Sequence, residues 1–257
     1  MTPESAGWRY LSFRVASSSY AADTGGEELA LVPLRGSCRV EFDGAVWEIG
    51  GRRNVFDGMP WALYLPRDTE YRVETDGPLE LAICGALCER RREPVLVEPR
   101  DVEIEVRGAG NATRQINHIL KPEFPAERLL VVEVFTPAGN WSSYPPHKHD
   151  EDRPPDEVVL EETYYYRTAR PEAFAVQRLY SPSHGLDVTA TVRDGDLMLV
   201  PFGYHTTCAA HGYDLYYLNA LAGDRRSRAA ADDAELAWVR SAWNAMEKDP
   251  RVPLVTP

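Results

Sequence analysis

Two histidines separated by one residue, and a third that follows a proline–glycine corner, have the spacing of a metal site. In an extended strand alternate side chains share a face, so His147 and His149 point the same way. The third imidazole is that of His205. Three imidazoles and one carboxylate suit Zn, Fe, Mn, Co or Ni. The residues predict one divalent ion, with zinc the first choice and Mn, Fe, Co or Ni the alternatives.

The carboxylate that completes the site follows a polar, proline-containing stretch at 150–157. Three glutamates are near enough in sequence to reach the metal: Glu157, Glu161 and Glu162. In a strand Glu162, Tyr164 and Tyr166 would share one face, and Glu161 would lie on the other. The alternative without a metal is a pair of surface histidines beside a proline turn. A zinc site built from two cysteine pairs is not favoured, because the four cysteines are scattered.

The residues before His205 predict how that histidine is positioned. Gly195 is a turn residue, the run Leu197-Met198-Leu199-Val200 is an apolar strand, and Pro201-Phe202-Gly203 is a corner that stops it. All six histidines lie at or beyond His118. The first half of the chain is therefore expected to hold no histidine-rich metal ion.

Composition favours a cytoplasmic enzyme with a small-molecule substrate. The chain has 257 residues, 44% of them hydrophobic, enough for one large core or two smaller ones. No apolar run is long enough to span a membrane, and the first residues lack the pattern of a secretory signal. A formal net charge of −12 disfavours nucleic acid and anionic membranes as partners. Scattered cysteines suit a reducing compartment. A homo-oligomer is left open.

Short strand-like runs with Gly, Pro and Asp between them predict an all-β fold. Asp43-Gly44 between two alternating runs indicates a hairpin. The same rhythm restarts after Arg100, so we expect two jelly-roll-like β-barrels, with domains at 1–105 and 106–257. Asp232 and Asp233 are expected to cap a short C-terminal helix with a structural role, packed on the barrel exterior. Its apolar positions have helical spacing and are Leu236, Val239, Trp243 and Met246.

These motifs resemble those of the cupin superfamily. Its first motif is a glycine, His-x-His and a glutamate, and its second is a glycine, Pro-x-Gly and a histidine. Gly139, His147, His149 and Glu162 match the first, although the interval before the glutamate is longer than usual, and 195–205 matches the second. With two barrels, the resemblance implies a bicupin.

A narrower resemblance covers both halves of the chain. The segments 141–150, 160–167 and 174–178 are closely similar to the 5-deoxy-glucuronate isomerases of bacterial myo-inositol catabolism, and 52–66 looks familial too. The related uronate ketol-isomerases of pectin breakdown share a looser form of the pattern. The resemblance implies an aldose–ketose isomerisation of 5-deoxy-D-glucuronate, a sugar acid, to 5-dehydro-2-deoxy-D-gluconate. It also implies His147, His149, Glu162 and His205 as the metal ligands.

Moving a carbonyl to the neighbouring carbon places negative charge on oxygen, which a bound divalent ion can stabilise. Proton transfer then needs a further acid or base. The candidates are Tyr144, Lys148, Tyr165, Arg178 and His211, and Arg178 followed by Lys148 is favoured for holding the substrate carboxylate. Two other functions use the same fold and remain as alternatives: an iron-dependent dioxygenase and a non-enzymatic sugar-binding protein.

Overall fold

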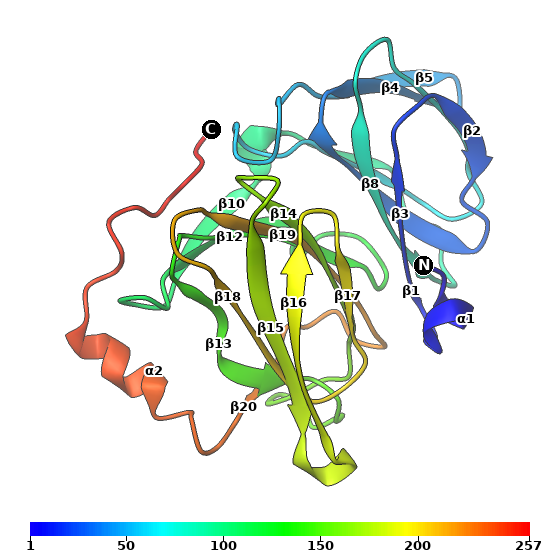
Figure 1. Cartoon of the computed structure of the whole chain (residues 1–257). Helices are drawn as coiled ribbons and strands as arrows, with labels where there is room; N and C mark the ends of the chain where they lie inside the picture. Colours follow the sequence, from blue (N-terminus) through cyan, green and yellow to red (C-terminus); the bar gives the residue numbers. More distant parts are fainter.

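Alternation of apolar and polar residues forms the strands of the first domain. In β4 (Ser37–Phe42) the side chains of Cys38, Val40 and Phe42 are buried and those between them are exposed. Asp43 and Gly44 both have positive φ, at 49° and 75°, and close a tight hairpin to β5 (Ala45–Gly50). The computed structural model describes residues 1–257, and it has two domains built of antiparallel strands (Figure 1).

The first domain packs two sheets face to face. A five-stranded sheet has the order β1-β8-β3-β6-β9, and a four-stranded sheet has the order β2-β7-β4-β5. Besides β4 and β5, the elements of this domain are α1 (Pro3–Ala6), β1 (Leu11–Ala16), β2 (Tyr20–Asp23), β3 (Glu27–Arg35), β6 (Ala62–Leu65), β7 (Glu70–Glu74), β8 (Glu80–Leu87) and β9 (Val95–Val97).

The second domain repeats this arrangement with one more strand in each sheet. A six-stranded sheet has the order β10-β11-β12-β19-β14-β17, and a five-stranded sheet has the order β16-β15-β18-β13-β20. The strands are β10 (Glu103–Arg107), β11 (Arg114–Leu120), β12 (Leu130–Thr136), β13 (Trp141–Lys148), β14 (Glu161–Thr168), β15 (Phe174–Ser181), β16 (Leu186–Arg193), β17 (Leu197–Val200), β18 (Tyr204–Ala209), β19 (Leu215–Ala222) and β20 (Ala231–Asp232).

The chain passes between the domains through the short 3₁₀ helix η1 (Pro99–Asp101). The predicted boundary between residues 105 and 106 falls inside β10. The largest apolar cluster holds 27 buried residues from both domains, among them Phe13, Tyr64, Phe135 and Tyr165. The clusters inside each domain are smaller, at 13 and 12 residues. The two barrels therefore share a core.

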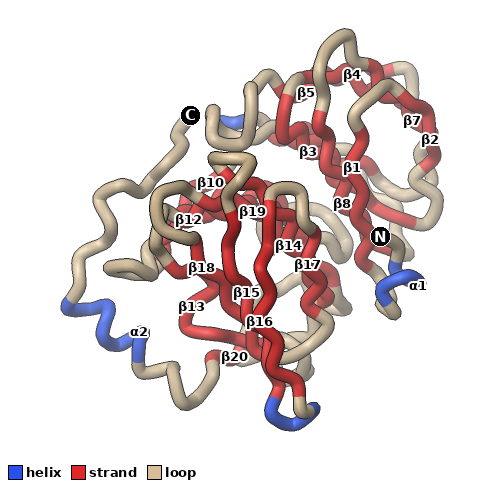
Figure 2. Tube along the Cα trace, in the orientation of Figure 1, coloured by secondary structure: helices blue, strands red, loops and turns tan.

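Helix is scarce and confined to short turns (Figure 2). None of the helices has the length and apolar character needed to cross a bilayer. The C-terminal helix is present but shorter than expected: α2 spans only Val239–Ala242, followed by η3 (Trp243–Ala245). Neither aspartate predicted as a cap is at its start, because the residue before α2 is Trp238, which makes no side-chain cap. The carboxylate of Asp232 pairs with Arg240, and Asp233 accepts the backbone N–H of Glu235. A third 3₁₀ turn, η2 (Pro182–His184), links β15 to β16.

Candidate metal centre

The predicted ligands come together inside the second barrel, between its two sheets. His147 lies on β13 and is directly paired with His205 of the neighbouring strand β18. His149 follows the end of β13 and is buried. Glu162 projects from β14 of the facing sheet. The alternation of β14 that directs Glu162 inward also directs Tyr164 inward, and the ring of Tyr164 lies 5.9 Å from that of His205.

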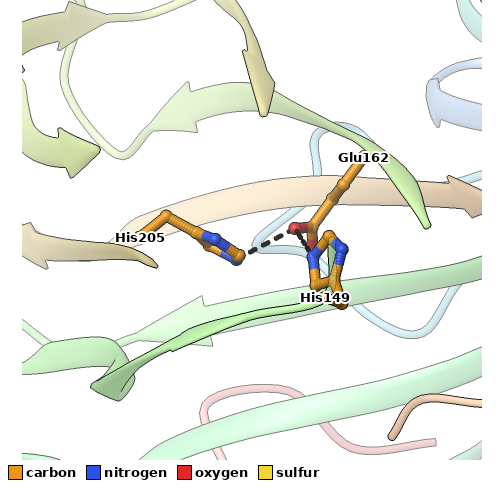
Figure 3. Close-up of side chains that lie close together, drawn as sticks. All are labelled: His149, Glu162 and His205. Atoms are coloured by element: carbon orange, nitrogen blue, oxygen red, sulfur yellow. Dashed lines mark hydrogen bonds and ion pairs between the residues drawn. The ribbon is translucent and has the colours of Figure 1, made fainter. Parts of the chain in front are cut away.

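Glu162 is the centre of the cluster (Figure 3). Its Oε2 accepts a hydrogen bond from Nε2 of His149 at 2.8 Å, and its Oε1 accepts one from Nδ2 of Asn219 at 2.7 Å. Nε2 of His205 lies 3.0 Å from the same Oε2 but lacks hydrogen-bond geometry, so this buried nitrogen has no hydrogen-bond partner. His149, Glu162 and His205 together can hold a metal ion.

His147 lies beside this triad. Its ring centre is 4.6 Å from that of His205 and 6.3 Å from that of His149. Burial, and then His205, hold the pKa of His147 well below its usual value, so the imidazole is neutral and able to donate a lone pair. Burial opposes ionisation of Glu162, but His205 and His149 outweigh it and hold the pKa of this carboxyl well below its usual range.

The Pro-x-Gly corner fixes the start of β18. Gly203 has φ of +88°, and its N–H donates to Oδ2 of Asp150 at 2.7 Å. A Cβ at this position would lie 2.7 Å from the carbonyl oxygen of Tyr180. Only glycine fits both the backbone conformation and the space.

Gly203→Ala should therefore destabilise the fold and displace His205, two residues further on. Positive φ at a non-glycine residue costs about 1–3 kcal/mol, and the backbone clash adds to it. The temperature of thermal unfolding and the metal content should both fall. Gly212→Ala is the matched control for the clash, because Gly212 also has positive φ, at +99°, but has no atom within 4 Å of the added Cβ. Equal metal loss in the two variants would contradict the argument.

The other two carboxylates face away from the histidines. Both oxygens of Glu161 accept backbone N–H groups of the first domain, from Arg9, Tyr10 and Leu11. Glu157 is fully buried and pairs with Lys148 at 2.9 Å. Three glutamates were near enough in sequence to be the metal ligand. Only Glu162 lies among the imidazoles.

None of the five residues predicted for acid–base chemistry lines the cavity beside the cluster. Lys148 points away from it and pairs with Asp150, Glu151 and Glu157. Tyr165 faces the first domain and donates to Glu80. Their catalytic role stays a prediction.

Arg178 and Tyr144 also lie outside the cavity. Because Leu179 is the residue paired with His205, Arg178 projects from the opposite face of the sheet. There it is exposed, pairs with Asp187 and lies over the ring of Tyr180. Tyr144 packs its ring against Trp141. His211, the fifth candidate, is exposed.

A cavity of about 140 Å³ opens beside the triad and is lined by His147, His149 and Glu162. Cavities of about 150 Å³ hold a molecule the size of benzene. Its walls carry residues that the sequence did not indicate as functional, and they come from several elements: Arg107, Arg114, Ser143, Tyr164, Tyr217, Asn219, Arg228 and Arg240. Arg240 lies on α2, so the C-terminal segment contributes to the cavity and is not only an exterior support.

Two tyrosines that line this cavity have hydroxyl groups paired with serine hydroxyls. The hydroxyl of Tyr217 lies 2.7 Å from that of Ser142, and the hydroxyl of Tyr164 lies 3.0 Å from that of Ser143. Burial raises the pKa of Tyr217, so its hydroxyl keeps its proton at neutral pH. These hydroxyls can donate hydrogen bonds to oxygen atoms of a polar ligand.

Fold and site together define the class, a bicupin with a histidine–glutamate cluster in its second barrel. The bicupin oxalate decarboxylase of Lactobacillus farciminis has the same fold: the TM-score is 0.65 at 11% identity, over 90% of this chain and 82% of that one. The chain belongs to the KduI/IolB family, whose model matches residues 1–239.

Two relatives lie much nearer in sequence. The 5-deoxy-glucuronate isomerase of Geobacillus kaustophilus is 43% identical over 245 residues, which cover 93% of this chain and 89% of that protein. The crystal structure of an IolB-like protein from Salmonella typhimurium superposes with a TM-score of 0.90 at 37% identity, over 93% of this chain and 94% of that one.

Proposed function

We propose that this protein is a metal-dependent aldose–ketose isomerase that converts 5-deoxy-D-glucuronate to 5-dehydro-2-deoxy-D-gluconate. The observation that carries the proposal is the buried His149–Glu162–His205 triad at the wall of a polar cavity, in a chain of the KduI/IolB family. The 43% identity to a 5-deoxy-glucuronate isomerase supplies the substrate.

We assign His147 as the fourth ligand and zinc as the first choice of metal. The orphaned Nε2 of His205 supports a bound cation, since a metal would satisfy a nitrogen that no hydrogen bond satisfies. A neutral His147 lies against His205 and lines the same cavity. Three imidazoles and a carboxylate match zinc and the other first-row divalent ions.

A divalent ion held here would act as a Lewis acid toward the carbonyl and the neighbouring hydroxyl of the sugar. The protein groups around it orient the substrate. Asn219 holds Glu162 in place through Nδ2, as partners of metal ligands commonly do. Tyr164 and Tyr217 line the same cavity, and we assign their hydroxyls as hydrogen-bond donors to sugar oxygens.

We also place the protein in the cytoplasm. All four cysteines are free, and Cys38, Cys84 and Cys88 are buried. Free cysteines of this kind are typical of a reducing compartment.

Removal of the metal is the direct test. We expect about one divalent ion per chain by elemental analysis, loss of 5-deoxy-glucuronate isomerisation after treatment with a chelator, and recovery when a divalent ion is restored. The reaction is followed by NMR of the sugar. Full activity in demonstrably metal-free protein would contradict the proposal, and oxygen uptake with bound iron would favour a dioxygenase instead.

A further inference from the structure

Four arginines line the cavity beside the metal triad, and two of them are already neutralised. Arg107 donates to both carboxylate oxygens of Glu105, at 2.6 and 2.8 Å. Arg240 pairs with both carboxylate oxygens of Asp232. These two pairs shape the wall but offer little net charge to a ligand. The two remaining arginines, Arg114 and Arg228, are different.

Arg228 has no partner in the chain. Its Nη1 is buried without a hydrogen bond, and the carboxylates of Glu162 and Glu105 act on its guanidinium without forming a salt bridge. Burial, and then the nearby Arg107, lower its pKa, yet arginine stays protonated at any physiological pH. Arg228 as a whole is half-buried, but the enclosed Nη1 is cut off from water without a partner. An enclosed, unpaired cationic donor is costly, so this side chain is expected to meet an anion when the site is in use.

Arg114 adds a second positive charge. Its Nη1 donates only to the backbone carbonyl oxygens of Ala112 and Tyr144, at 3.0 and 3.3 Å. Its guanidinium lies over the ring of Trp243 from the C-terminal segment, 5.9 Å from the ring centre. Burial lowers the pKa of Arg114 to about 10, which leaves it charged at neutral pH. No carboxylate neutralises it.

A net charge of −12 makes these two arginines significant. An acidic protein repels an anionic substrate at long range, so binding depends on local cations. The sequence favoured Arg178 and Lys148 for this role, but Arg178 is paired with Asp187 on the outer surface and Lys148 with three carboxylates. Neither is available inside the cavity.

We propose that Arg228, assisted by Arg114, binds the carboxylate of the sugar-acid substrate and so selects a uronate over an uncharged sugar. The inference rests on the proposed function and adds its specificity determinant. One end of the sugar would face the histidine–glutamate cluster and its carboxylate would face Arg228, since both line the same cavity. The planar guanidinium matches a carboxylate through two parallel hydrogen bonds.

The test is Arg228→Gln, assayed on 5-deoxy-glucuronate and on the analogue whose carboxylate is an amide. Removing a charge-assisted hydrogen bond inside the cavity should reduce kcat/KM on the acid roughly ten- to a hundredfold, mainly through KM, and leave the amide within about threefold. Arg228→Lys should show a smaller loss on the acid, because lysine keeps the charge without the paired donors. If the glutamine variant does not fold, Arg228→Lys provides the test in its place.

Arg225→Gln is the matched control, because Arg225 lies in the same segment and pairs with Asp152 at the surface. It should match the wild type on both compounds. Metal content is measured for every variant by elemental analysis. Equal losses on acid and amide, no loss on the acid, or loss of metal from Arg228→Gln would each overturn the proposal, because Arg228 would then support the cluster or the scaffold.

Calorimetric binding separates this inference from the proposed isomerase activity. D-glucuronate and D-glucose serve as probes of the wild type and of Arg228→Gln. If the wild type fails to isomerise 5-deoxy-glucuronate, the proposed function is wrong. The carboxylate site still stands if D-glucuronate binds more tightly than D-glucose and the glutamine variant removes that preference. Absence of any preference in the wild type would overturn the carboxylate site itself.

Discussion

Glu162→Gln should remove the metal ion and abolish isomerisation, whereas Glu161→Gln should preserve both. The two carboxylates are adjacent in sequence and project from opposite faces of β14. Glu162 lies between His149 and His205, so an amide there removes the one anionic ligand. Lewis-acid stabilisation contributes several kcal/mol to such reactions, so the rate should fall roughly a thousandfold or more.

Glu161 should give a different result because it joins the two domains. Its carboxylate accepts three backbone N–H groups at 2.6 to 3.0 Å. Glutamine has one acceptor oxygen and places an amide against the remaining donors. We expect a loss of about 1.5–3 kcal/mol in the free energy of unfolding, with metal content unchanged. Glu157→Gln should likewise retain the metal, since Glu157 pairs with Lys148 and Arg153.

Elemental analysis and urea unfolding of the three variants check this ordering. Metal content should be low only in Glu162→Gln, and the native fold of that variant is verified by circular dichroism. Metal loss from Glu161→Gln, with Glu162→Gln still loaded, would show that β14 presents the other face to the histidines.

Much of the histidine–glutamate cluster was accessible from sequence because strand alternation decides which side chains share a face, although the preference for Glu162 over Glu157 and Glu161 came mainly from the family resemblance. Period-two geometry accounts for the shared face of His147 and His149 and for that of Glu162 and Tyr164. The corner at Gly203 accounts for the position of His205. The same rule separated Lys148 from the histidines, but it could not name the carboxylates that pair with Lys148. Those partners come from the loop at 150–157, whose path no periodicity describes.

Arg178 illustrates the limit most clearly. It was favoured for holding the substrate carboxylate, yet it lies on the outer face with Asp187 of the adjacent strand β16 as its partner. Conversely, Arg228 lies in a segment without regular structure, where no periodicity indicates the direction of a side chain. Arg240 lies in the segment that was expected to form a helix on the barrel exterior. Its cavity position depends on how the C-terminal segment wraps the barrel, which is a tertiary property.

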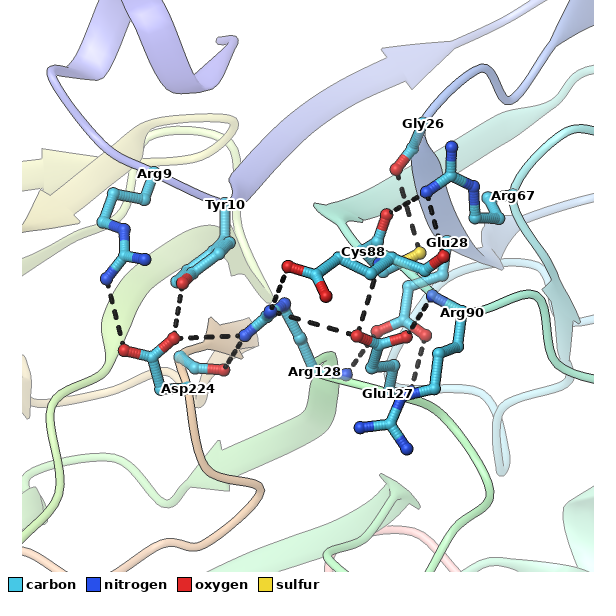
Figure 4. Close-up of polar contacts among 12 residues, drawn as sticks. Arg9, Tyr10, Gly26, Glu28, Arg67, Cys88, Arg90, Glu127, Arg128 and Asp224 are labelled. Atoms are coloured by element: carbon cyan, nitrogen blue, oxygen red, sulfur yellow. Dashed lines mark hydrogen bonds and ion pairs between the residues drawn. The ribbon is translucent and has the colours of Figure 1, made fainter.

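Several charged groups are buried where the two domains meet, and they set how the barrels are docked. Glu28 of the first domain accepts the backbone N–H groups of Glu127, Arg128 and Leu129, at 2.6 to 2.7 Å. Figure 4 shows this contact beside the pairing of Arg128 with Asp224. Apolar packing alone is not directional, so these contacts fix the relative position of the domains.

The most buried ion pair of this interface joins Arg52 to Glu133. Nη1 of Arg52 lies 3.0 Å from Oε2 of Glu133, and the side chains are 4% and 0% exposed. Asn117 also donates to Glu133, and Arg52 donates to the carbonyl oxygen of Pro33. Burial alone would lower the pKa of Arg52, but Glu133 outweighs it and raises the pKa. Each side chain of the pair thus depends on the other to compensate its buried charge.

Glu133→Gln should cost about 3–5 kcal/mol of unfolding free energy, because it leaves the Arg52 charge buried without its counter-ion. The double variant Arg52→Met/Glu133→Leu should recover most of that loss, since apolar side chains of similar volume need no counter-ion. Glu74→Gln is the matched control: it breaks the exposed pair with Arg39, whose side chains are 50% and 47% exposed, and should cost less than about 1 kcal/mol. Urea unfolding measures all three. If the double variant is as unstable as Glu133→Gln, the lost stability belongs to the hydrogen bonds with Asn117 and Pro33 and not to the uncompensated charge.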